Sequence, residues 1–344
     1  MTTKAVILAA GVGTRMRPLT LRRPKPLVPV AGRPLIEHII GGLVAGGFTE
    51  IGLVVGYMQD LIRERLGDGR RLGACVEYIV QEEPAGTGAA MLLAEEFVAG
   101  ERFFLGWGDI MVPPKSYREI SEICRRESPD ALLTVNYVDD PWEGAAVYVS
   151  EEGHVQRIVE KPPKGTATTN LNNSGLFVLG PELIEMLKTT APSERGEVEV
   201  PSAIDAMLLS GKRMRVYEID GYWSDVARPS TALHVSGEMI AAASRDGVII
   251  HPDARVAPAA RLVGPVRIGA GARVDGGTLG PNVTVMERAT VGAGAKLANA
   301  CLYPDSGVGR GCELEWAIVE EGVQVADGVA LKGSAEQAAV EEGN

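Results

Sequence analysis

The stretch that decides the fold is residues 8–30, LAAGVGTRMRPLTLRRPKPLVPV. It completes an apolar run over residues 4–10, KAVILAA, which ends at Gly11 and Gly13. This pattern predicts a buried strand followed by a tight turn whose backbone amides can face a phosphate. Four prolines follow the turn: Pro18, Pro24, Pro26 and Pro29. They exclude a long helix and favour an extended, stiffened segment.

Two common glycine motifs do not fit this turn. A dinucleotide-binding turn needs a third glycine where Met16 stands, and it needs a helix directly after the turn. A Walker loop needs Gly-Lys-Ser/Thr, which is absent. The stiffened segment carries Arg15 and Lys25, so it presents cations that are held in place for an anionic ligand.

Further along the first half, short apolar strands alternate with helical segments. Strands are expected at residues 51–55, 76–81 and 103–105. Helices are expected at residues 34–46, 58–66 and 88–97. Such alternation predicts an α/β fold with a mostly parallel sheet flanked by helices, and ligands bind such sheets at the carboxyl ends of the strands. The glycine turns fall at those ends.

A different pattern begins near residue 248. Apolar residues recur every six positions, with three steps of five: Ile250, Val256, Leu262, Ile268, Val274, Leu279, Val285, Val291, Leu297, Leu302, Val308, Leu314, Val319, Val325 and Leu331. One inward apolar residue per hexapeptide is typical of a parallel β-helix, here of about five coils. Each coil buries its apolar residues only by stacking on its neighbours.

These patterns divide the chain into four parts. Residues 1–235 are expected to form a catalytic domain, 236–247 a linking helix, 248–333 the β-helix and 334–344 a flexible tail. The length of 344 residues agrees with two domains. The 42 glycines serve both the strand-end turns and the turns of the repeat.

Charge and cysteine content narrow the function. The net charge of −11 disfavours nucleic acids and anionic membranes as partners. Seven basic residues precede the first acidic one, Glu37, and suggest a patch for a compact anion: Lys4, Arg15, Arg17, Arg22, Arg23, Lys25 and Arg33. The four cysteines have neither zinc-site nor disulfide spacing, and no apolar run reaches the roughly 20 residues of a membrane span, so we expect a cytoplasmic protein.

The opening stretch closely resembles the signature of the sugar-1-phosphate nucleotidyltransferases, L-A-x-G-x-G-T-R-L/M-x-P-L-T followed by P-K-P. Thirteen positions agree: Leu8, Ala9, Gly11, Gly13, Thr14, Arg15, Met16, Pro18, Leu19, Thr20, Pro24, Lys25 and Pro26. The resemblance implies a Rossmann-like catalytic domain. It also implies that the C-terminal β-helix is left-handed. It also implies an enzyme of nucleotide-sugar biosynthesis.

Later segments resemble further motifs of this family, in the same order. They are QEEPAGTG at 81–88, GWGD at 106–109, VEKP at 159–162, NNSGLF at 172–177, SERGEVE at 193–199 and GYWSDV at 221–226. One departure follows the last motif. The usual Gly-Thr-Pro reads Ala227-Arg228-Pro229.

The resemblance implies a role for each matching residue. The catalytic cations would be Arg15 and Lys25. The nucleotide would be bound by Leu8, Ala9, Ala10, Gly11, Gly13, Thr14, Gln81, Gly86 and Thr87. The sugar phosphate would be bound by Gly108, Glu160, Lys161, Asn173 and Glu197. Mg²⁺ would be held by Asp109 and Asp225, whose carboxylates are hard oxygen ligands.

The implied reaction is attack of a sugar 1-phosphate on the α-phosphate of a nucleoside triphosphate. UTP or dTTP, with glucose 1-phosphate or N-acetylglucosamine 1-phosphate, are the expected substrates. A mannose-1-phosphate guanylyltransferase-like enzyme and an inactive regulatory or scaffold homologue remain alternatives. Acyl transfer by the β-helix is disfavoured because its only histidine, His251, stands at its start. We instead expect the β-helix to stack into a homo-oligomer.

Overall fold

The computed structural model describes residues 2–83, 85–193 and 196–343. Within them the chain forms two compact units. The sheet unit contains residues 2–12, 24–26 and 36–223. The coil unit contains residues 13–23, 27–35 and 224–343. The segment 13–23, called the arm below, therefore groups with the distant C-terminal part of the chain.

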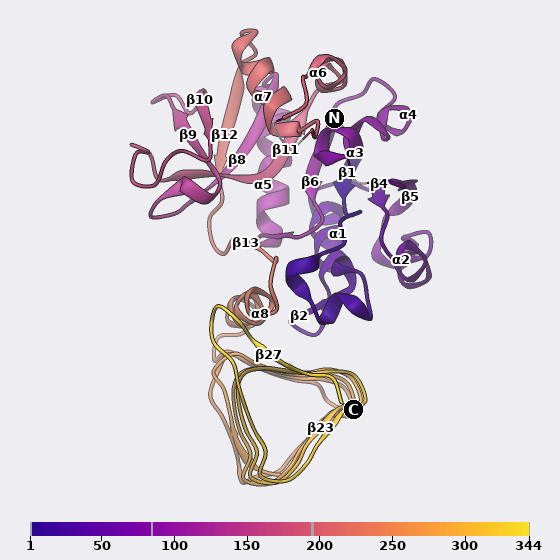
Figure 1. The fold of residues 1–344 in the computed structure, drawn as a ribbon, viewed down its shortest axis with the longest axis vertical. Helices are drawn as coiled ribbons and strands as arrows, with labels where there is room; N and C mark the ends of the chain where they lie inside the picture. The colour runs from indigo at the N-terminus through magenta and orange to yellow at the C-terminus, as the bar shows by residue number, and fades with distance from the viewer. Residues whose placement is uncertain (1, 84, 194–195, 344) are drawn as a thin grey trace. The chain divides into compact units, whose positions relative to one another are not determined.

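The sheet unit is built on one sheet (Figure 1). Its strands are β1 (Lys4–Leu8), β4 (Glu50–Val55), β5 (Cys75–Val80), β6 (Phe103–Trp107), β8 (Ala131–Tyr137), β9 (Ala145–Val149), β10 (Val155–Glu160), β11 (Leu171–Leu179) and β12 (Met214–Glu218). The order is β10-β9-β11-β6-β1-β4-β5, with β8 beside β11 and β12 beside β8. A two-residue strand, β7 (Ile110–Met111), follows β6.

The expectation of a mostly parallel sheet is correct for only half of it. Strands β6, β1, β4 and β5 run parallel, and so do β8 and β12. Strand β11 runs antiparallel to β6, β8 and β9, and β10 runs antiparallel to β9. The sheet is therefore mixed. Apolar patterning reveals a buried strand but not its direction, because both directions bury the same side chains.

Helices cover the sheet. They are α1 (Leu35–Ala45), α2 (Gln59–Leu66), α3 (Gly86–Leu92), α4 (Glu95–Val98), α5 (Pro114–Glu127), α6 (Glu182–Thr189) and α7 (Val200–Leu209). Part of the apolar core joins the sheet to α3, α6 and α7 through fully buried residues such as Phe103, Phe177 and Val200. The helix expected at residues 88–97 is divided into α3 and α4.

The proline-rich segment is not extended, contrary to expectation. It forms three short 3-10 helices at Thr14–Met16, Leu19–Leu21 and Lys25–Leu27. The fixed φ of proline, near −65°, suits a 3-10 turn as well as an extended chain, so proline content alone does not choose between them. The segment then forms a hairpin of β2 (Pro29–Val30) and β3 (Arg33–Pro34).

The C-terminal repeat forms parallel coils, which look triangular along their axis in Figure 1. The strands are β14 (Val248–Ile250), β15 (Arg255–Val256), β16 (Ala260–Leu262), β17 (Val266–Ile268), β18 (Arg273–Val274), β19 (Gly277–Leu279), β20 (Val283–Val285), β21 (Thr290–Val291), β22 (Lys296–Leu302), β23 (Gly307–Val308), β24 (Glu313–Val319), β25 (Gln324–Val325), β26 (Ala330–Lys332) and β27 (Ala339–Glu341). All pair in parallel.

The register confirms that three hexapeptides make one coil. Val248 pairs with Val266 and Thr290 with Gly307, which are offsets of 18 and 17 residues. The repeat positions from Ile268 to Val325 are buried, whereas Ile250 at the first coil is 46% exposed. Inner coils are covered on both sides and the terminal coils on one, as expected of a stacked repeat.

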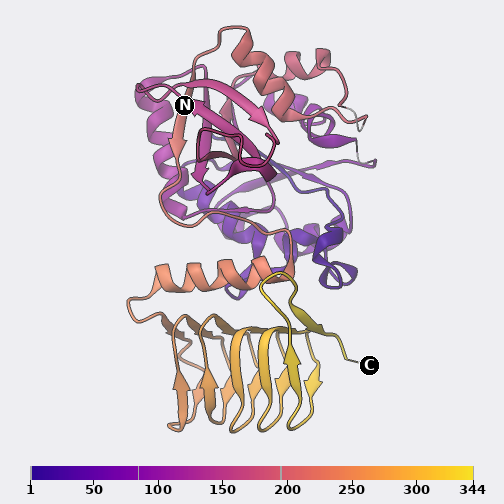
Figure 2. The same cartoon turned by 60° about the vertical axis from the view of Figure 1, so that its left-hand side comes forward.

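Helix α8 (Pro229–Ala243) precedes the coils and is longer than the expected linking helix. It packs along them on β14, β17, β20, β22 and β24 (Figure 2). The tail differs from the expected flexible segment. Its strand β27 pairs with β24, with Ala339 opposite Ala317, because the coil edge offers unpaired backbone groups.

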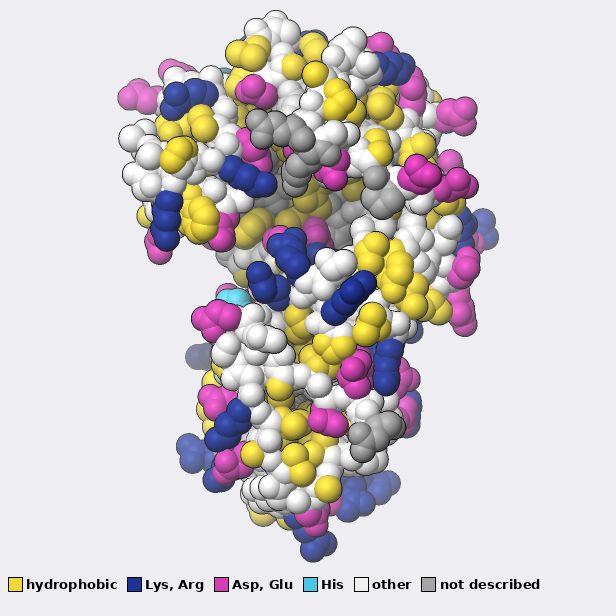
Figure 3. Space-filling view, in the orientation of Figure 1, with side chains coloured by type: hydrophobic (Ala, Val, Ile, Leu, Met, Phe, Trp, Pro, Cys, Tyr) yellow, Lys and Arg dark blue, Asp and Glu magenta, His cyan; other side chains and the backbone are white. Residues whose placement is uncertain are grey.

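The surface of the coil unit carries mixed charges (Figure 3). Exposed ion pairs join Arg288 to Asp305 and Lys296 to Glu313. Within the described part of the chain, every helix is too short or too polar to cross a membrane.

Candidate active site

The carboxyl ends of β1, β4, β5 and β6 meet in the sheet unit, as the sequence predicts. The Gly108 amide donates to the Leu8 carbonyl at 2.8 Å, and the Ala9 amide donates to the Val54 carbonyl at 2.8 Å. A Cβ at Gly56 would lie 2.9 Å from the Gln81 carbonyl oxygen and 3.0 Å from that of Ala10. The structure therefore brings two of the predicted nucleotide-binding residues, Ala10 after β1 and Gln81 after β5, together beside Gly56.

Gly56 was missed by the motif comparison. The available signal was its place directly after a buried strand, beside the glycine turns of the neighbouring strands. Any side chain there would push the Ala10 and Gln81 backbones apart. Gly56 is therefore a residue that shapes this edge of the sheet.

Two glycines at this edge serve different purposes. A Cβ at Gly108 would lie 2.8 Å from the Ala9 Cβ, so packing within the protein requires this glycine. Among the described residues, a Cβ at Gly11 would meet no atom within 4 Å, and Gly11 does not have a positive φ. Neither packing against these residues nor a left-handed conformation requires glycine at position 11.

Lys25 and Asp109 form an ion pair at the end of β6. Lys25 Nζ donates to Asp109 Oδ2 at 2.6 Å, although the two residues are 84 positions apart in the sequence. The exposed fractions of the side chains are 12% for Lys25 and 26% for Asp109, so both are largely withdrawn from water. Lys25 begins a 3-10 turn, and its ammonium group reaches Asp109, the residue after Gly108.

Asp109 retains one donor atom for a cation. Its Oδ1 is buried and has no hydrogen-bond partner among the described residues. Within the same residues there is no cluster of three or more His, Cys, Asp or Glu side chains that could hold a metal by itself. Mg²⁺ is often bound by one or two carboxylates together with substrate phosphates and water. The donors present fit that mode of binding.

The predicted base loop and the Glu197 segment pack on each other. The Gly88 amide donates to the Val198 carbonyl at 2.8 Å, and the Val200 amide donates to Thr87 Oγ1 at 3.0 Å. Gly86 has a φ of +92°, and a Cβ there would lie 2.6 Å from the Val198 oxygen. Two motifs more than 100 residues apart thus form one wall. Their members Pro84, Glu194 and Arg195 lie outside the described residues.

Two of the predicted sugar-binding residues, Glu160 and Lys161, lie at the start of β9. The Lys161 amide donates to the Gly144 carbonyl at 2.8 Å, and Glu160 pairs with Ala145. Asn172 is buried, and its side chain bonds the Ala145 amide and Asn136.

The side-chain bonds of Asn172 join β11 to β9 and β8, and the choice of Asn173 as the sugar-binding residue stays a prediction. Asn173 is half-buried, and its Oδ1 accepts from the Gly175 amide at 3.1 Å. A Cβ at Gly175 would lie 3.4 Å from Trp107 and from Ile110, the residues that flank Gly108 and Asp109. Gly175, two residues after Asn173, therefore packs against the segment that carries Gly108 and Asp109.

The remaining candidates belong to the coil unit. Gly13 has a φ of +67°, and its carbonyl accepts a bond from the Thr20 hydroxyl at 2.9 Å. The arm then exposes Thr14 and Arg15. Asp225 ends β13 (Ser224–Asp225) and is half-buried.

The departure at Ala227-Arg228 coincides with a helix start. The Arg228 amide donates to the Thr231 hydroxyl at 3.0 Å, and that hydroxyl donates to the Arg228 carbonyl at 2.7 Å. Pro229 begins α8 at a position that suits proline. The exposed Arg228 therefore serves as the N-terminal cap residue of the helix.

Three of the seven basic residues of the N-terminal segment pair with carboxylates. Lys4 pairs with Glu101 at 2.7 Å, and Lys25 pairs with Asp109. Arg23 pairs with Glu320 at 2.6 Å, within the coil unit. Carboxylates therefore offset part of the positive charge of this segment.

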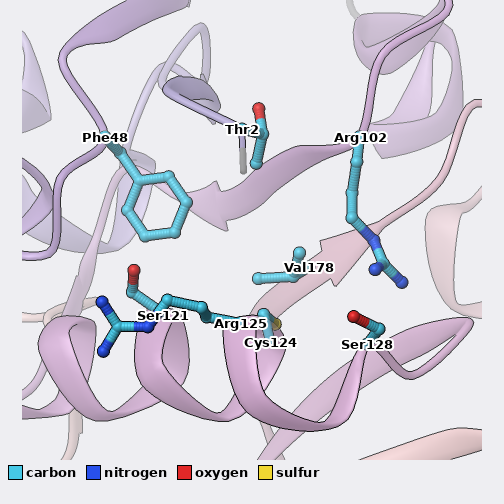
Figure 4. Close-up of a pocket in the computed structure, with 8 residues that line it drawn as sticks. All are labelled: Thr2, Phe48, Arg102, Ser121, Cys124, Arg125, Ser128 and Val178. Carbon is cyan, nitrogen blue, oxygen red and sulfur yellow. The ribbon is translucent and has the colours of Figure 1, made fainter.

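A separate cavity of about 280 Å³ lies against α5 in the sheet unit (Figure 4). Ser121, Cys124 and Arg125 line it from the helix, opposite Phe48 and Arg102. Burial raises the pKa of the Cys124 thiol to about 11, which disfavours a reactive thiolate. The residues that line this cavity belong to none of the motifs above.

Comparison with known proteins agrees with this arrangement. The model of the nucleotidyl transferase family matches residues 4–240, and that of the GlmU-like C-terminal hexapeptide matches residues 262–339. Glucose-1-phosphate thymidylyltransferase of Streptomyces griseus is 31% identical over 331 residues, which cover 94% of this chain and 88% of that protein.

Two further similarities cover the N-terminal part. The bifunctional protein GlmU of Methanococcus maripaludis is 35% identical over 236 residues, 69% of this chain but only 54% of that protein. The crystal structure of a UDP-glucose pyrophosphorylase with UDP-glucose matches with a TM-score of 0.62 and 23% identity, over 69% of this chain and 97% of that one, which shows a common fold. From its sequence motifs, its fold and these matches, the chain belongs to the nucleotidyl transferase family.

Proposed function

We propose that the protein transfers a nucleotidyl group from UTP or dTTP to glucose 1-phosphate or N-acetylglucosamine 1-phosphate. The Lys25–Asp109 pair carries this proposal. It combines a withdrawn cation with a carboxylate that has one oxygen without a hydrogen-bond partner among the described residues, at the edge of the sheet where the Gly108 amide bonds the Leu8 carbonyl. A thymidylyltransferase similar along 94% of the chain supports the choice of nucleotide and sugar.

In the proposed reaction, an oxygen of the sugar phosphate forms a bond to the α-phosphorus. The bond from that phosphorus to the oxygen bridging to the β-phosphate breaks, and pyrophosphate leaves with the electron pair. The attacking group is already an anion near neutral pH, so no general base is needed. Catalysis then consists of neutralising charge and aligning the two anions.

Each predicted residue has a task in this scheme. Lys25 and Arg15 would hold the triphosphate and the charge that develops on it. Lys161 would bind the incoming phosphate, while Glu160, Asn173 and Glu197 would orient the sugar. Gln81, Gly86 and Thr87 would hold the base, and the backbone of residues 8–14 would approach the phosphates.

Asp109 and Asp225 would hold the Mg²⁺. A cation bound there would supply neutralisation of phosphate charge. The two aspartates would contribute the protein's share of its oxygen ligands, and Lys25 would orient the Asp109 carboxylate through its hydrogen bond.

We also propose a division of the chain into four parts. Residues 1–235 would be the catalytic domain, 236–247 the linker, 248–333 a left-handed β-helix and 334–344 the tail. We also propose that the protein works in the cytoplasm and that its coil supports a homo-oligomer.

The test is pyrophosphate release from UTP, dTTP, GTP, CTP and ATP, each with glucose, N-acetylglucosamine and mannose 1-phosphates. We expect UTP or dTTP to give the highest kcat/KM. Preference for GTP with mannose 1-phosphate would replace this proposal by the guanylyltransferase alternative, and no turnover with any pair would favour the inactive homologue. Acetyl-coenzyme A consumption, measured in the same samples, tests whether the β-helix transfers acyl groups.

Variants connect the activity to the site. Lys25→Ala and Asp109→Ala should each lower kcat by at least a hundredfold, because charge stabilisation of this kind is commonly worth that much. Thermal unfolding checks that both variants remain folded. Arg70→Ala, which removes an exposed cation outside the motifs, is the matched control and should leave kcat unchanged. Near-normal turnover in either site variant would overturn the assignment.

A further inference from the structure

The arm is fastened to the coils by a buried ion pair. Arg23 Nη2 donates to Glu320 Oε2 at 2.6 Å, across 297 residues of sequence. The exposed fraction is 0% for the Glu320 side chain and 15% for that of Arg23. Removing one partner from a buried pair strands the charge of the other, so such a pair fixes the relative position of its two segments.

The surroundings of the pair belong to two successive coils. Glu320 directly follows β24, and Tyr303 directly follows β22, its parallel neighbour. The Arg23 guanidinium lies 4.7 Å from the centroid of the Tyr303 ring, a cation–π distance, and the ring is 1% exposed. One arginine thus binds the corner of both coils.

A weaker contact lies beside the first. Arg22 Nη2 donates to the Glu342 carbonyl at 3.1 Å, next to the tail strand β27. The Glu320 amide in turn donates to the Glu341 carbonyl at 2.9 Å. Arm, coil corner and tail strand therefore form one connected group within the coil unit.

Hydrogen bonds within the arm hold its residues together, so fixing Arg23 also restricts where Arg15 can lie. The Met16 amide donates to the Gly13 carbonyl at 2.9 Å, and the Leu21 amide donates to the Pro18 carbonyl at 2.8 Å. The Thr20 hydroxyl also returns to the Gly13 carbonyl. Arg15 lies eight positions before Arg23 on this short, folded segment.

We infer that Arg23 and Glu320 are positioning residues through which the coils hold Arg15 in place for nucleotidyl transfer. The C-terminal repeat is thus part of the catalytic apparatus, in addition to any role in assembly. The inference rests on the proposed function of Arg15. The geometry that carries it, the buried pair and its aromatic neighbour, does not depend on that function.

The test uses the full chain with Glu320→Gln, Arg23→Gln, Arg23→Lys and the double variant Arg23→Gln/Glu320→Gln. Hydrogen exchange of peptides covering residues 13–23 measures opening of the arm without substrates, and steady-state kinetics measure kcat and KM for the triphosphate. Arg288→Gln is the matched control, because it breaks an exposed ion pair of the same coils whose side chains are 62% and 47% exposed.

We expect Glu320→Gln and Arg23→Gln to speed arm exchange at least tenfold and to lower kcat at least tenfold. Arg23→Lys should recover part of both losses. The double variant should lose less than the two single changes predict, because it strands no charge. Arg288→Gln should change neither arm exchange nor kcat.

Two results would overturn the inference. The first is unchanged arm exchange in both single glutamine variants, whatever the activity. The second is faster arm exchange with kcat and KM at wild-type values, which would make the pair purely structural. A wild-type protein that releases no pyrophosphate would instead refute the proposed function, while faster arm exchange in Glu320→Gln would still support the fastening of the arm.

Discussion

At the scale of single residues, the charged groups of this protein fall into two kinds. Exposed pairs such as Arg288–Asp305 are screened by water and contribute little. Withdrawn pairs, Lys25–Asp109 and Arg23–Glu320, each join segments that are far apart in the sequence. Because a stranded partner is costly, the withdrawn pairs determine where their segments lie.

Glu37 on α1 is itself buried, although its two arginine partners are half-exposed, and it gives a pH prediction. Its side chain is 4% exposed and accepts bonds from Arg71 at 2.5 Å and Arg65 at 2.7 Å. Burial alone raises the pKa of Glu37, but the two arginines outweigh burial and hold this pKa below its ordinary value. Stability from this group is therefore complete above the unfolded-state pKa and is lost as the pH falls through the folded-state pKa.

We expect Glu37→Gln to lower the free energy of unfolding by about 1–3 kcal/mol at pH 7. The difference from wild type should begin to shrink as the pH falls below the ordinary glutamate pKa, where the unfolded chain binds a proton, and should shrink further as the pH falls through the lower folded-state pKa of Glu37. Urea denaturation at pH 7, 4 and 3 measures this. Glu64→Gln removes an exposed carboxylate from α2 and should give no such trend. A gap that is equal at all three pH values would contradict the assignment.

At the scale of elements, the sequence predicts individual strands, turns and helices but not the contacts between elements that are far apart in the chain. The strand β1, its glycine turn and the helices α1 and α2 follow from short-range periodicity and capping residues. The direction of β11 does not, because nothing in its own residues specifies its neighbours. The packing of the Gly86–Gly88 turn on Val198 could not be predicted from the sequence either. Each of the two motifs was matched separately, and such matches do not give the distance between them.

That packing gives a prediction for the base loop. Gly86 and Gly100 have left-handed φ values of +92° and +75°, but only a Cβ at Gly86 would meet the backbone, 2.6 Å from the Val198 oxygen. Alanine at either position incurs the same kind of backbone strain, roughly 1 kcal/mol. Only Gly86→Ala must also push the loop from its support.

We therefore expect Gly86→Ala to raise KM for the triphosphate at least tenfold, because the base loop moves. Gly100→Ala should lower the midpoint of thermal unfolding by a few degrees and leave KM unchanged. KM values and thermal unfolding midpoints of the two variants distinguish backbone strain at the substituted residue from displacement of the base loop. Equal KM values in both would show that the loop does not contact the nucleotide.

At the scale of the whole molecule, the repeat could be read from the sequence because each coil must bury its apolar residue on the next. Spacing alone gave the three-hexapeptide coil that the strand register confirms. The membership of the arm in the coil unit could not be read. It depends on Arg23 meeting Glu320, and no periodicity links residues 297 positions apart.

Because the coils form a one-dimensional stack, the position of a residue in the stack should set its contribution to stability. Leu302 lies in an inner coil and is 0% exposed, whereas Leu331 lies in the last hexapeptide and is half-buried. The same Leu→Ala change removes the same atoms at both. At Leu302 it leaves a cavity closed by coils on both sides, while at Leu331 the site opens to water and can collapse.

We expect Leu302→Ala to lower the free energy of unfolding of the coils by about 2–5 kcal/mol and Leu331→Ala by about 1 kcal/mol. Trp316 stands in β24, so its fluorescence reports the coil unit, and Trp316→Phe identifies its share of the signal. Urea denaturation followed at this probe gives both values. Equal losses at the two sites would mean that the terminal coil is covered as fully as the inner ones, as it would be if a second copy of the chain stacked on it.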